Sequence, residues 1–119
     1  MKKVSAVITT HNRCELLLKA IESVKNQTYK NIEIIVVDDA SSDSTLDKCR
    51  ILDGIKYIRI NTSKGGNYAR NVGIKNSSGH YIAFLDDDDE WYPTKIEKQL
   101  GLFDKHKNKL FQTCFIIII

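Results

Sequence analysis

The sequence predicts an α/β fold with a mainly parallel sheet, and three observations support this class. Apolar segments of strand length alternate with segments of helical periodicity along the chain. The order runs strand, helix, strand, helix up to a fifth strand, which favours parallel strands joined by right-handed crossovers. Polar clusters follow three of the predicted strands, and in a parallel sheet such ends share one edge. The pattern therefore predicts one polar crevice at that edge.

Five segments are predicted as strands because they are short, apolar and rich in β-branched or aromatic residues. The second (Ile-Glu-Ile-Ile-Val-Val) is almost wholly apolar, which suits a parallel strand covered on both faces, whereas the third alternates. The predicted strands are Val4–Thr9, Ile32–Val37, Ile55–Ile60, Tyr81–Leu85 and Leu110–Ile118.

Four segments between these strands are predicted as helices. The first has apolar residues at i, i+3, i+4 and i+7, which gives it one apolar face. Ser41-Ser42-Asp43 offers N-cap side chains to the second, and the third carries small residues that permit close packing on a sheet. Pro93 suits the first position of the fourth. The predicted helices are Glu15–Asn26, Ser44–Ile51, Asn67–Asn76 and Lys95–Phe103, with a loop at Thr62–Gly66.

Composition places the chain among soluble globular proteins, with residues 1–119 as a single domain. Hydrophobic residues make up 42% and charged residues 28%, and the net charge of +3 is too weak and too evenly spread to indicate nucleic acid. No run approaches the roughly 20 apolar residues of a membrane span, and the start lacks the apolar core of a signal peptide. Three distant cysteines and three unpaired histidines predict reduced thiols and no zinc site.

The chain ends on its most apolar stretch, Phe115–Ile119. A β-branched run of this kind is typical of a central strand, so we expect a truncated chain; a C-terminal strand buried in a small sheet is the alternative. Ile116–Ile119 is also expected to expose an apolar strand edge and to promote aggregation.

Asp86–Asp89 follows the fourth predicted strand directly and is the most informative motif. Two unit charges ~6 Å apart repel by roughly 3 kcal/mol at an effective dielectric constant of about 20. The cluster must therefore be well solvated, as in a plain acidic turn, or neutralised by a cation. Carboxylate oxygens suit Mg²⁺, Mn²⁺ or Ca²⁺.

Asp38 and Asp39 follow the second predicted strand in the same way. A carboxylate here can accept a hydrogen bond from a base ring N–H or a sugar hydroxyl. A helix cap is the alternative, but Ser42 or Asp43 already suits that role.

Basic and polar residues complete the predicted crevice. Lys64-Gly65-Gly66 with Arg70 lies at a loop-to-helix junction, where glycines allow close approach and a helix start favours phosphate. Asn12 and Arg13 follow the first strand and either contact a nucleotide or form an exposed turn, with Asn12 as a possible helix cap. Trp91 is expected to pack in the core.

Four ordered motifs between Val4 and Lys105 resemble the family 2 glycosyltransferases, which are inverting enzymes of the GT-A fold. The motifs are Val7-Ile8-Thr9-Thr10-His11-Asn12-Arg13, Ile34–Thr45 with its Asp38-Asp39-Ala40-Ser41-Ser42-Asp43 core, Gly65-Gly66 with Ala69–Ile74, and Ile82–Asp89. The resemblance implies an α/β nucleotide-sugar-binding fold.

The resemblance also implies roles for individual residues. Thr9 would line the nucleoside pocket, Asp39 would accept from the uracil N–H with support from Asp38, and Arg70 would lie near the diphosphate. Within the acidic motif Asp88 is the best metal ligand, Asp86 and Asp87 would meet metal or ribose, and Asp89 would support them. The donor would be a UDP-sugar bound with Mn²⁺ or Mg²⁺.

The implied activity is sugar transfer to a saccharide or lipid-linked acceptor in bacterial surface polysaccharide or cell-wall synthesis, in the cytoplasm or at the inner face of the membrane. The family's general base is an acidic residue in the second half of the domain, so we expect it beyond Ile119. A non-catalytic nucleotide-binding fragment is therefore the alternative. A phosphoryl-accepting receiver domain fits poorly, because its acidic pair would follow the first strand.

Overall fold

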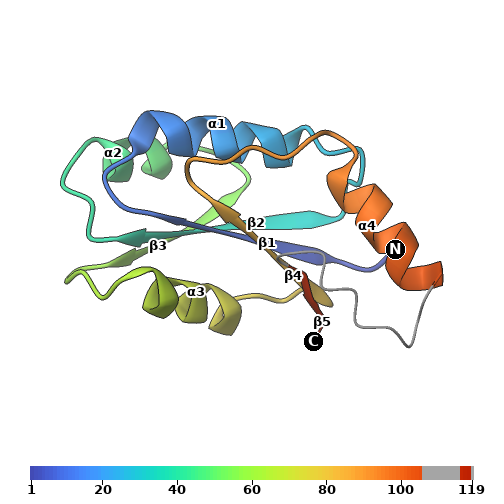
Figure 1. Cartoon of the computed structure of the whole chain (residues 1–119). Coiled ribbons are helices and arrows are strands. Elements are labelled where there is room, and N and C mark those ends of the chain that lie inside the picture. Colours follow the sequence, from blue (N-terminus) through green and yellow to red (C-terminus); the bar gives the residue numbers. More distant parts are fainter. Residues whose placement is uncertain (106–115, 119) are drawn as a thin grey trace.

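The computed structural model describes residues 1–105 and 116–118, and within them the strands form one five-stranded sheet in the order β3-β2-β1-β4-β5 (Figure 1). β1 to β4 are parallel, and β5 pairs antiparallel with β4. The predicted mainly parallel sheet is confirmed. The strands are β1 (Val4–Thr10), β2 (Ile32–Asp39), β3 (Ile55–Ile60), β4 (Tyr81–Asp86) and β5 (Ile116–Ile118).

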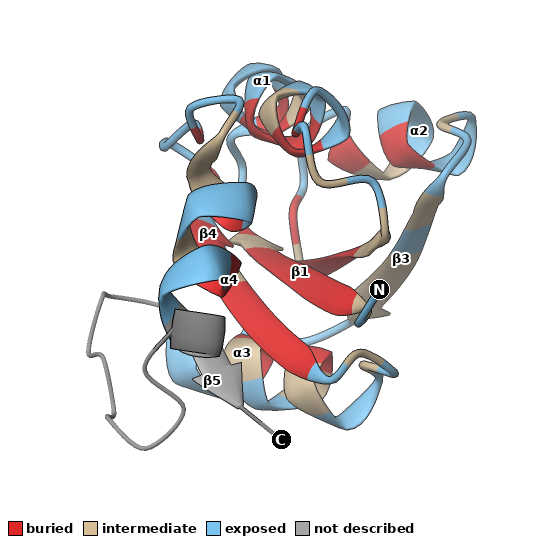
Figure 2. Ribbon diagram, turned by 90° about the vertical axis from the view of Figure 1, so that its right-hand side faces the viewer, coloured by how far each residue is buried: buried red, intermediate tan, exposed pale blue. Residues whose placement is uncertain are grey.

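Helices cover both faces of this sheet. α1 and α2 lie on one face and α3 on the other, and α4 packs on the α1 face through Ile96 and Leu100 (Figure 1). Figure 2 shows the buried strands enclosed between these layers. The helices are α1 (Cys14–Lys25), α2 (Thr45–Arg50), α3 (Gly66–Lys75) and α4 (Lys95–Lys105). None of the helices in the described residues has the length and apolar character required to cross a bilayer.

The side chains of β1 alternate between two apolar clusters, one on each face of the sheet. Ala6 and Ile8 join the larger cluster with Leu17 of α1 and Ile96 of α4, whereas Val7 joins the smaller cluster under α3. Each fully buried Val, Leu or Ile side chain among them stabilises the fold by about 1.5–3 kcal/mol. The central strands are thus fixed from both sides, which gives a rigid base to the loops at their ends.

α3 packs unusually close to β1 because position 73 is a glycine. A Cβ atom built on Gly73 would lie 2.3 Å from Cγ1 of Val7, far inside van der Waals contact. The expectation that small residues let this helix approach the sheet is therefore confirmed at Gly73. Ala69, one helical turn earlier, is completely buried.

Several predicted boundaries differ from the structure. β1, β2 and β4 each extend one or two residues further, so that Thr10, Asp39 and Asp86 are strand residues. α2 begins at Thr45, and Ser44 precedes it without a side-chain cap; instead the Asp43 carboxylate accepts from the Thr45 amide at 3.0 Å.

The predicted last strand is described over Ile116–Ile118, and its segment 110–115 lies outside the described residues. β5 is the outer strand at the β4 side of the sheet. The expected apolar edge at Ile116–Ile119 stays a prediction.

Candidate functional site

A cleft of about 350 Å³ opens where β1, β2 and β4 end. The register explains why these ends meet, because Thr10 pairs with Asp38 on one side and Thr9 pairs with Asp86 on the other. Seven predicted site residues line the cleft, which confirms the expected polar crevice: Thr9, Arg13, Asp39, Arg70, Asp86, Asp87 and Asp88. Four further residues line it: Thr10, His11 and Gly66, which belong to the motifs of the predicted crevice, and Ala69, which was not predicted there.

Asp39 is held in the cleft wall by the loop before α3. Its Oδ1 accepts from the Lys64 amide at 2.8 Å, and its Oδ2 accepts from Ser63 Oγ at 2.8 Å and the Gly65 amide at 3.0 Å. Burial alone would raise the pKa of this carboxyl, but these hydrogen bonds outweigh it and hold the pKa below its usual range. A carboxylate has about four acceptor positions, so one remains for a ligand.

Asp38 differs from this arrangement and does not line the cleft. Its side chain is completely buried and accepts from the Ser41 amide at 2.9 Å, from the Tyr57 hydroxyl, and from Arg59 Nη1 at 3.1 Å. Burial, followed by the bond to Asp38, raises the pKa of Tyr57, which keeps the phenol protonated as a donor. Asp38 thus ties β2 to β3 and shapes the loop after β2.

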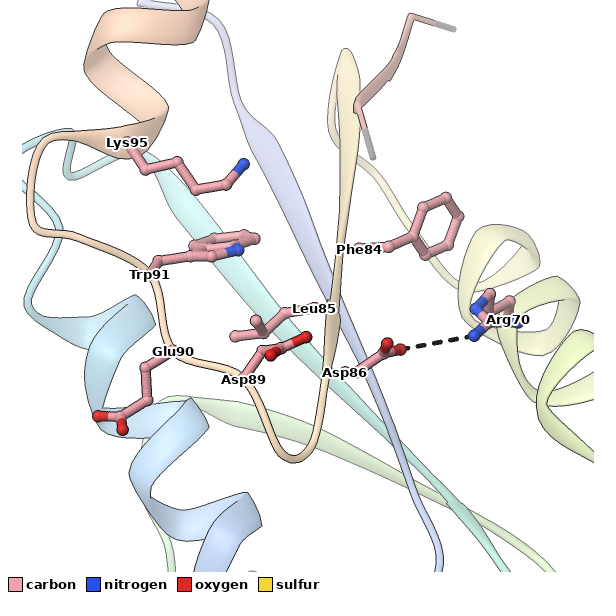
Figure 3. Close-up of a pocket in the computed structure, with 8 residues that line it drawn as sticks. All are labelled: Arg70, Phe84, Leu85, Asp86, Asp89, Glu90, Trp91 and Lys95. Atoms are coloured by element: carbon pink, nitrogen blue, oxygen red, sulfur yellow. Dashed lines mark hydrogen bonds and ion pairs between the residues drawn. The ribbon is translucent and has the colours of Figure 1, made fainter. Parts of the chain in front are cut away.

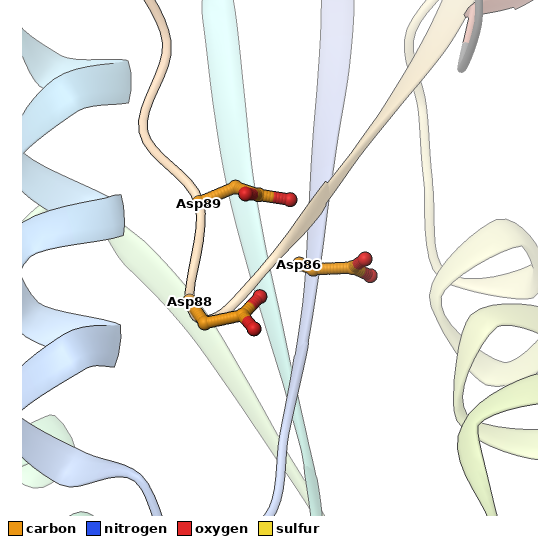
Figure 4. A group of neighbouring side chains, drawn as sticks. All are labelled: Asp86, Asp88 and Asp89. Atoms are coloured by element: carbon orange, nitrogen blue, oxygen red, sulfur yellow. The ribbon is translucent and has the colours of Figure 1, made fainter.

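Three carboxylates of the acidic run form a cluster on the cleft side of β4. Oxygens of Asp86, Asp88 and Asp89 all lie within 4.8 Å of one another, and the three side chains are exposed (Figure 4). Asp86 ends β4, while Asp88 and Asp89 lie in the following turn, which closes with a 3.0 Å bond from the Asp89 amide to the Asp86 carbonyl. The structure therefore brings Asp89 into the cluster, whereas the sequence predicted a supporting position for it. Exposed hard oxygen atoms at this spacing fit a divalent cation.

Asp87 turns away from this cluster and is nearly buried. Its Oδ2 accepts from Thr10 Oγ1 at 2.9 Å, and its Oδ1 lies 3.3 Å from Arg13 Nη1. The same Arg13 nitrogen lies 3.1 Å from Asp88 Oδ2. Asp87 therefore connects the end of β1 to the acidic turn, and it holds the Arg13 guanidinium at the cleft.

The opposite wall carries Arg70 on the second turn of α3. Its Nη1 donates to Asn67 Oδ1 at 3.0 Å, and its Nη2 lies 3.5 Å from Asp86 Oδ1. Gly65 precedes the helix with φ +92°, a backbone conformation that residues other than glycine rarely adopt. Lys64 was predicted as a phosphate-binding side chain, but that side chain is exposed and does not line the cleft; only its backbone amide contacts the site, through Asp39.

Asn12 also lies outside the cleft lining, and it does not cap α1. Its Oδ1 instead accepts from the amides of Ser42 at 2.7 Å and Asp43 at 3.3 Å, with its own backbone at φ +53°. The first amide of α1, on Cys14, is satisfied by Asp43 Oδ2 at 3.2 Å. Asn12 and Asp43 thus fasten the loops after β1 and β2 to each other.

A second cavity of about 320 Å³ adjoins the cleft and shares Arg70 and Asp86 with it (Figure 3). Its wall is largely apolar, from Phe84, Leu85 and Trp91, with Asp89, Glu90 and Lys95 at its margin. The Lys95 ammonium lies 4.9 Å from the centroid of the Trp91 ring. Trp91 is 7% exposed and belongs to the core, as predicted, yet it also faces this cavity.

Comparison with known proteins agrees with this geometry. The model of the family described as "Glycosyl transferase family 2" matches residues 5–118. An Escherichia coli UDP-Glc:alpha-D-GlcNAc-diphosphoundecaprenol beta-1,3-glucosyltransferase, WfaP, is 44% identical over 112 residues, which are 90% of this chain and 43% of that protein. A Campylobacter jejuni GalNAc(5)-diNAcBac-PP-undecaprenol beta-1,3-glucosyltransferase is 39% identical over 98% of this chain and 39% of its own.

Among solved structures, TarS residues 1–349 of S. aureus in complex with UDP superimposes with a TM-score of 0.79 and 29% identity. The superposition covers 88% of this chain and 33% of that one. This chain spans less than half the length of each of these three proteins.

Proposed function

The chain belongs to glycosyl transferase family 2, and on that premise we propose that it binds a nucleotide diphospho-sugar, with UDP as the nucleotide, for transfer of the sugar to an acceptor hydroxyl. The observation that carries the proposal is the convergence of Asp39, two arginines and the acidic turn on one cleft. A base, a diphosphate and a cation each require one of these three kinds of group.

In this proposal Asp39 accepts a hydrogen bond from the ring N–H of uracil. Its lowered pKa keeps the carboxylate ionised at neutral pH, as an acceptor requires. Thr9 also lines the cleft, and we assign it to contact with the nucleoside. Asp38 acts indirectly by holding β2 and β3 together.

Arg13 and Arg70 approach the cleft from opposite walls, and we assign them to the diphosphate. Both guanidiniums rest on carboxylates at 3.1–3.5 Å and are partly exposed, so phosphate oxygens can reach them. Asp88, Asp86 and Asp89 would hold a divalent ion, with Mn²⁺ or Mg²⁺ as the candidates. When bound, such an ion neutralises charge that develops on the departing diphosphate, an effect worth several kcal/mol.

The sugar of the donor is assigned to the second cavity, because that cavity continues from Arg70 and Asp86, where the diphosphate would end. The flat Trp91 ring gives it an apolar floor, and Glu90 and Lys95 offer polar contacts for hydroxyl groups. A lipid-linked saccharide acceptor fits the undecaprenol-linked acceptors in the names of WfaP and the Campylobacter relative. We place the transfer in surface polysaccharide or cell-wall synthesis. A lipid-linked acceptor would bring the protein to the cytoplasmic face of a membrane.

Calorimetric titration of the chain with UDP, with and without Mn²⁺, tests the donor site. We expect binding that requires the cation in the wild type and is lost in Asp88→Ala. Asp47→Ala is the matched control, because Asp47 is an exposed aspartate of α2 outside the cleft. Binding of equal strength in Asp88→Ala and Asp47→Ala would refute the assignment of the acidic turn. An assay of sugar transfer from a radiolabelled UDP-sugar then separates an enzyme from a nucleotide-binding fragment.

A further inference from the structure

Gln27, just beyond the end of α1, is a completely buried polar side chain that joins three segments. Its Nε2 donates to the carbonyl of Tyr92 at 2.7 Å and to that of Ser23 at 3.2 Å, and its Oε1 accepts from the Ile96 amide at 3.1 Å. A buried amide whose oxygen and nitrogen are both hydrogen-bonded holds its partners firmly, because a buried polar group left without a partner is costly.

Two further hydrogen bonds join the same segments. The Trp91 amide donates to Ser23 Oγ at 3.1 Å, and the Thr28 amide donates to the Pro93 carbonyl at 2.8 Å. The Thr28 hydroxyl adds a bond to Glu97 Oε2 in the first turn of α4 at 2.7 Å. The stretch from Trp91 to the first turn of α4 is therefore attached to the end of α1 by at least five hydrogen bonds, two of which come from Gln27.

This attachment begins directly after the acidic turn. On its other side the turn is fixed by β4, whose Asp86 pairs with Thr9 of β1. Between these two anchors lie four residues, 87–90, which include Asp88 and Asp89 of the carboxylate cluster. Four residues held at both ends have little freedom, so the position of the second anchor decides where those carboxylates lie.

We infer that Gln27 is a positioning residue for the cation site, which it supports from outside the cleft by fixing the end of the acidic turn. The effect on cation affinity rests on the proposed function, whereas the effect on the order of the turn does not. Residues that support metal ligands without contacting the metal typically change its affinity by 10–100-fold when they are replaced.

Gln27→Met tests this, because it keeps the length of the side chain and removes both hydrogen-bonding ends. The matched control is Ser5→Ala. Ser5 is also completely buried and hydrogen-bonded, to Glu33 and the Gly79 amide, but it lies near the opposite end of β1. Ser23→Ala removes the bond to the Trp91 amide, together with the bond from Ser23 Oγ to the Ala20 carbonyl within α1, and leaves Gln27 in place. It serves if Gln27→Met does not fold.

Two measurements on each protein decide the outcome. We expect backbone order parameters from ¹⁵N relaxation for residues 87–90 to fall from about 0.85 toward 0.6 in Gln27→Met, and Mn²⁺ affinity in the presence of UDP to weaken at least about tenfold. Ser5→Ala should lower the melting temperature and leave both quantities at the wild-type value, and Ser23→Ala should shift both in the direction of Gln27→Met.

Order parameters and Mn²⁺ affinity that stay at the wild-type value in Gln27→Met and Ser23→Ala would overturn the inference and leave Gln27 a purely structural residue. A wild-type chain that binds no Mn²⁺ would instead overturn the proposed cation site. The order parameters of residues 87–90, measured without metal, would then decide the positioning role by themselves.

Discussion

Arg13 and Asp88 form an ion pair across the mouth of the cleft, with 3.1 Å between Nη1 and Oδ2. Both side chains are about half exposed, so the pair is worth at most about 1 kcal/mol. The guanidinium therefore partly neutralises the acidic turn and can still be displaced by a ligand. A bound cation would compete with Arg13 for Asp88, whereas a diphosphate would attract both.

Replacing Arg13 by Gln should separate these two effects. Without nucleotide, we expect Mn²⁺ to bind up to about fivefold more tightly, because a competing charge worth at most about 1 kcal/mol is gone. In the presence of Mn²⁺, UDP should bind more weakly, since a partner for phosphate is lost. Calorimetric titrations measure both, with Arg50→Gln on the exposed end of α2 as the control. Weaker Mn²⁺ binding by Arg13→Gln alone would contradict this competition.

Asp39→Asn should abolish most of the nucleotide affinity. The substituted amide keeps one acceptor oxygen, but its NH₂ group faces donors from Ser63 and Gly65 or from the base. Loss of a hydrogen bond to a charged acceptor costs about 1.5–3 kcal/mol, which corresponds to a factor of about 10–100 in the dissociation constant. Titration with UDP measures it, and Asp47→Asn should bind like the wild type. A less than twofold change would remove Asp39 from the base site.

Stability should depend on pH through Asp43, which joins the start of α1 to that of α2. Burial would raise the pKa of this carboxyl, but the bonds from Thr45 and from the Cys14 amide outweigh it and lower the pKa. A lowered pKa in the folded state means that the stabilisation is complete above the ordinary carboxyl pKa of about 3.9 and is lost as pH falls below it. Urea unfolding between pH 7 and pH 2.5 measures this. At pH 7 the Asp43→Asn variant should have a lower free energy of unfolding than the wild type. On acidification it should lose less of that free energy than the wild type does.

Gly73→Ala should destabilise the fold even though alanine is the better helix former. The new methyl would meet Val7 at 2.3 Å, and overpacking of this kind costs about 1–3 kcal/mol against a helix-propensity gain of about 1 kcal/mol. Gly101→Ala is the control, because a Cβ there meets nothing within 4 Å and should stabilise α4 by up to about 1 kcal/mol. Thermal unfolding measures both, and a higher melting temperature for Gly73→Ala would show that α3 can move away from β1 without loss.

The class of fold and the location of the polar cleft were predictable because they depend on periodicity and on chain order. Parallel strands, alternating helices and the GT-A fold expected from the resemblance are all confirmed. The antiparallel direction of β5 was not predictable, because three isoleucines pair equally well in either direction.

Asp38 and Asp39 have different roles because each contacts residues that are distant in sequence. Successive residues of a strand point to opposite faces, so two adjacent carboxylates cannot both face the same loop. Asp38 faces Tyr57 and Arg59 on β3, whereas Asp39 faces the loop before α3. Likewise, the turn after Asp86 decides that Asp89 joins the cluster and Asp87 leaves it. Side-chain direction in a turn is set by local dihedral angles that residue types do not reveal.

The Thr10–Asp87 hydrogen bond joins residues 77 positions apart in the sequence, and the paired residues of β1 and β4 have the same separation. Contacts of such separation form late in folding, because the loop entropy must be overcome before they contribute. The cleft therefore does not exist in any partly folded chain that lacks the β1–β4 pairing. A nucleotide that binds there would act on the native state alone and would slow unfolding without speeding the early steps of collapse.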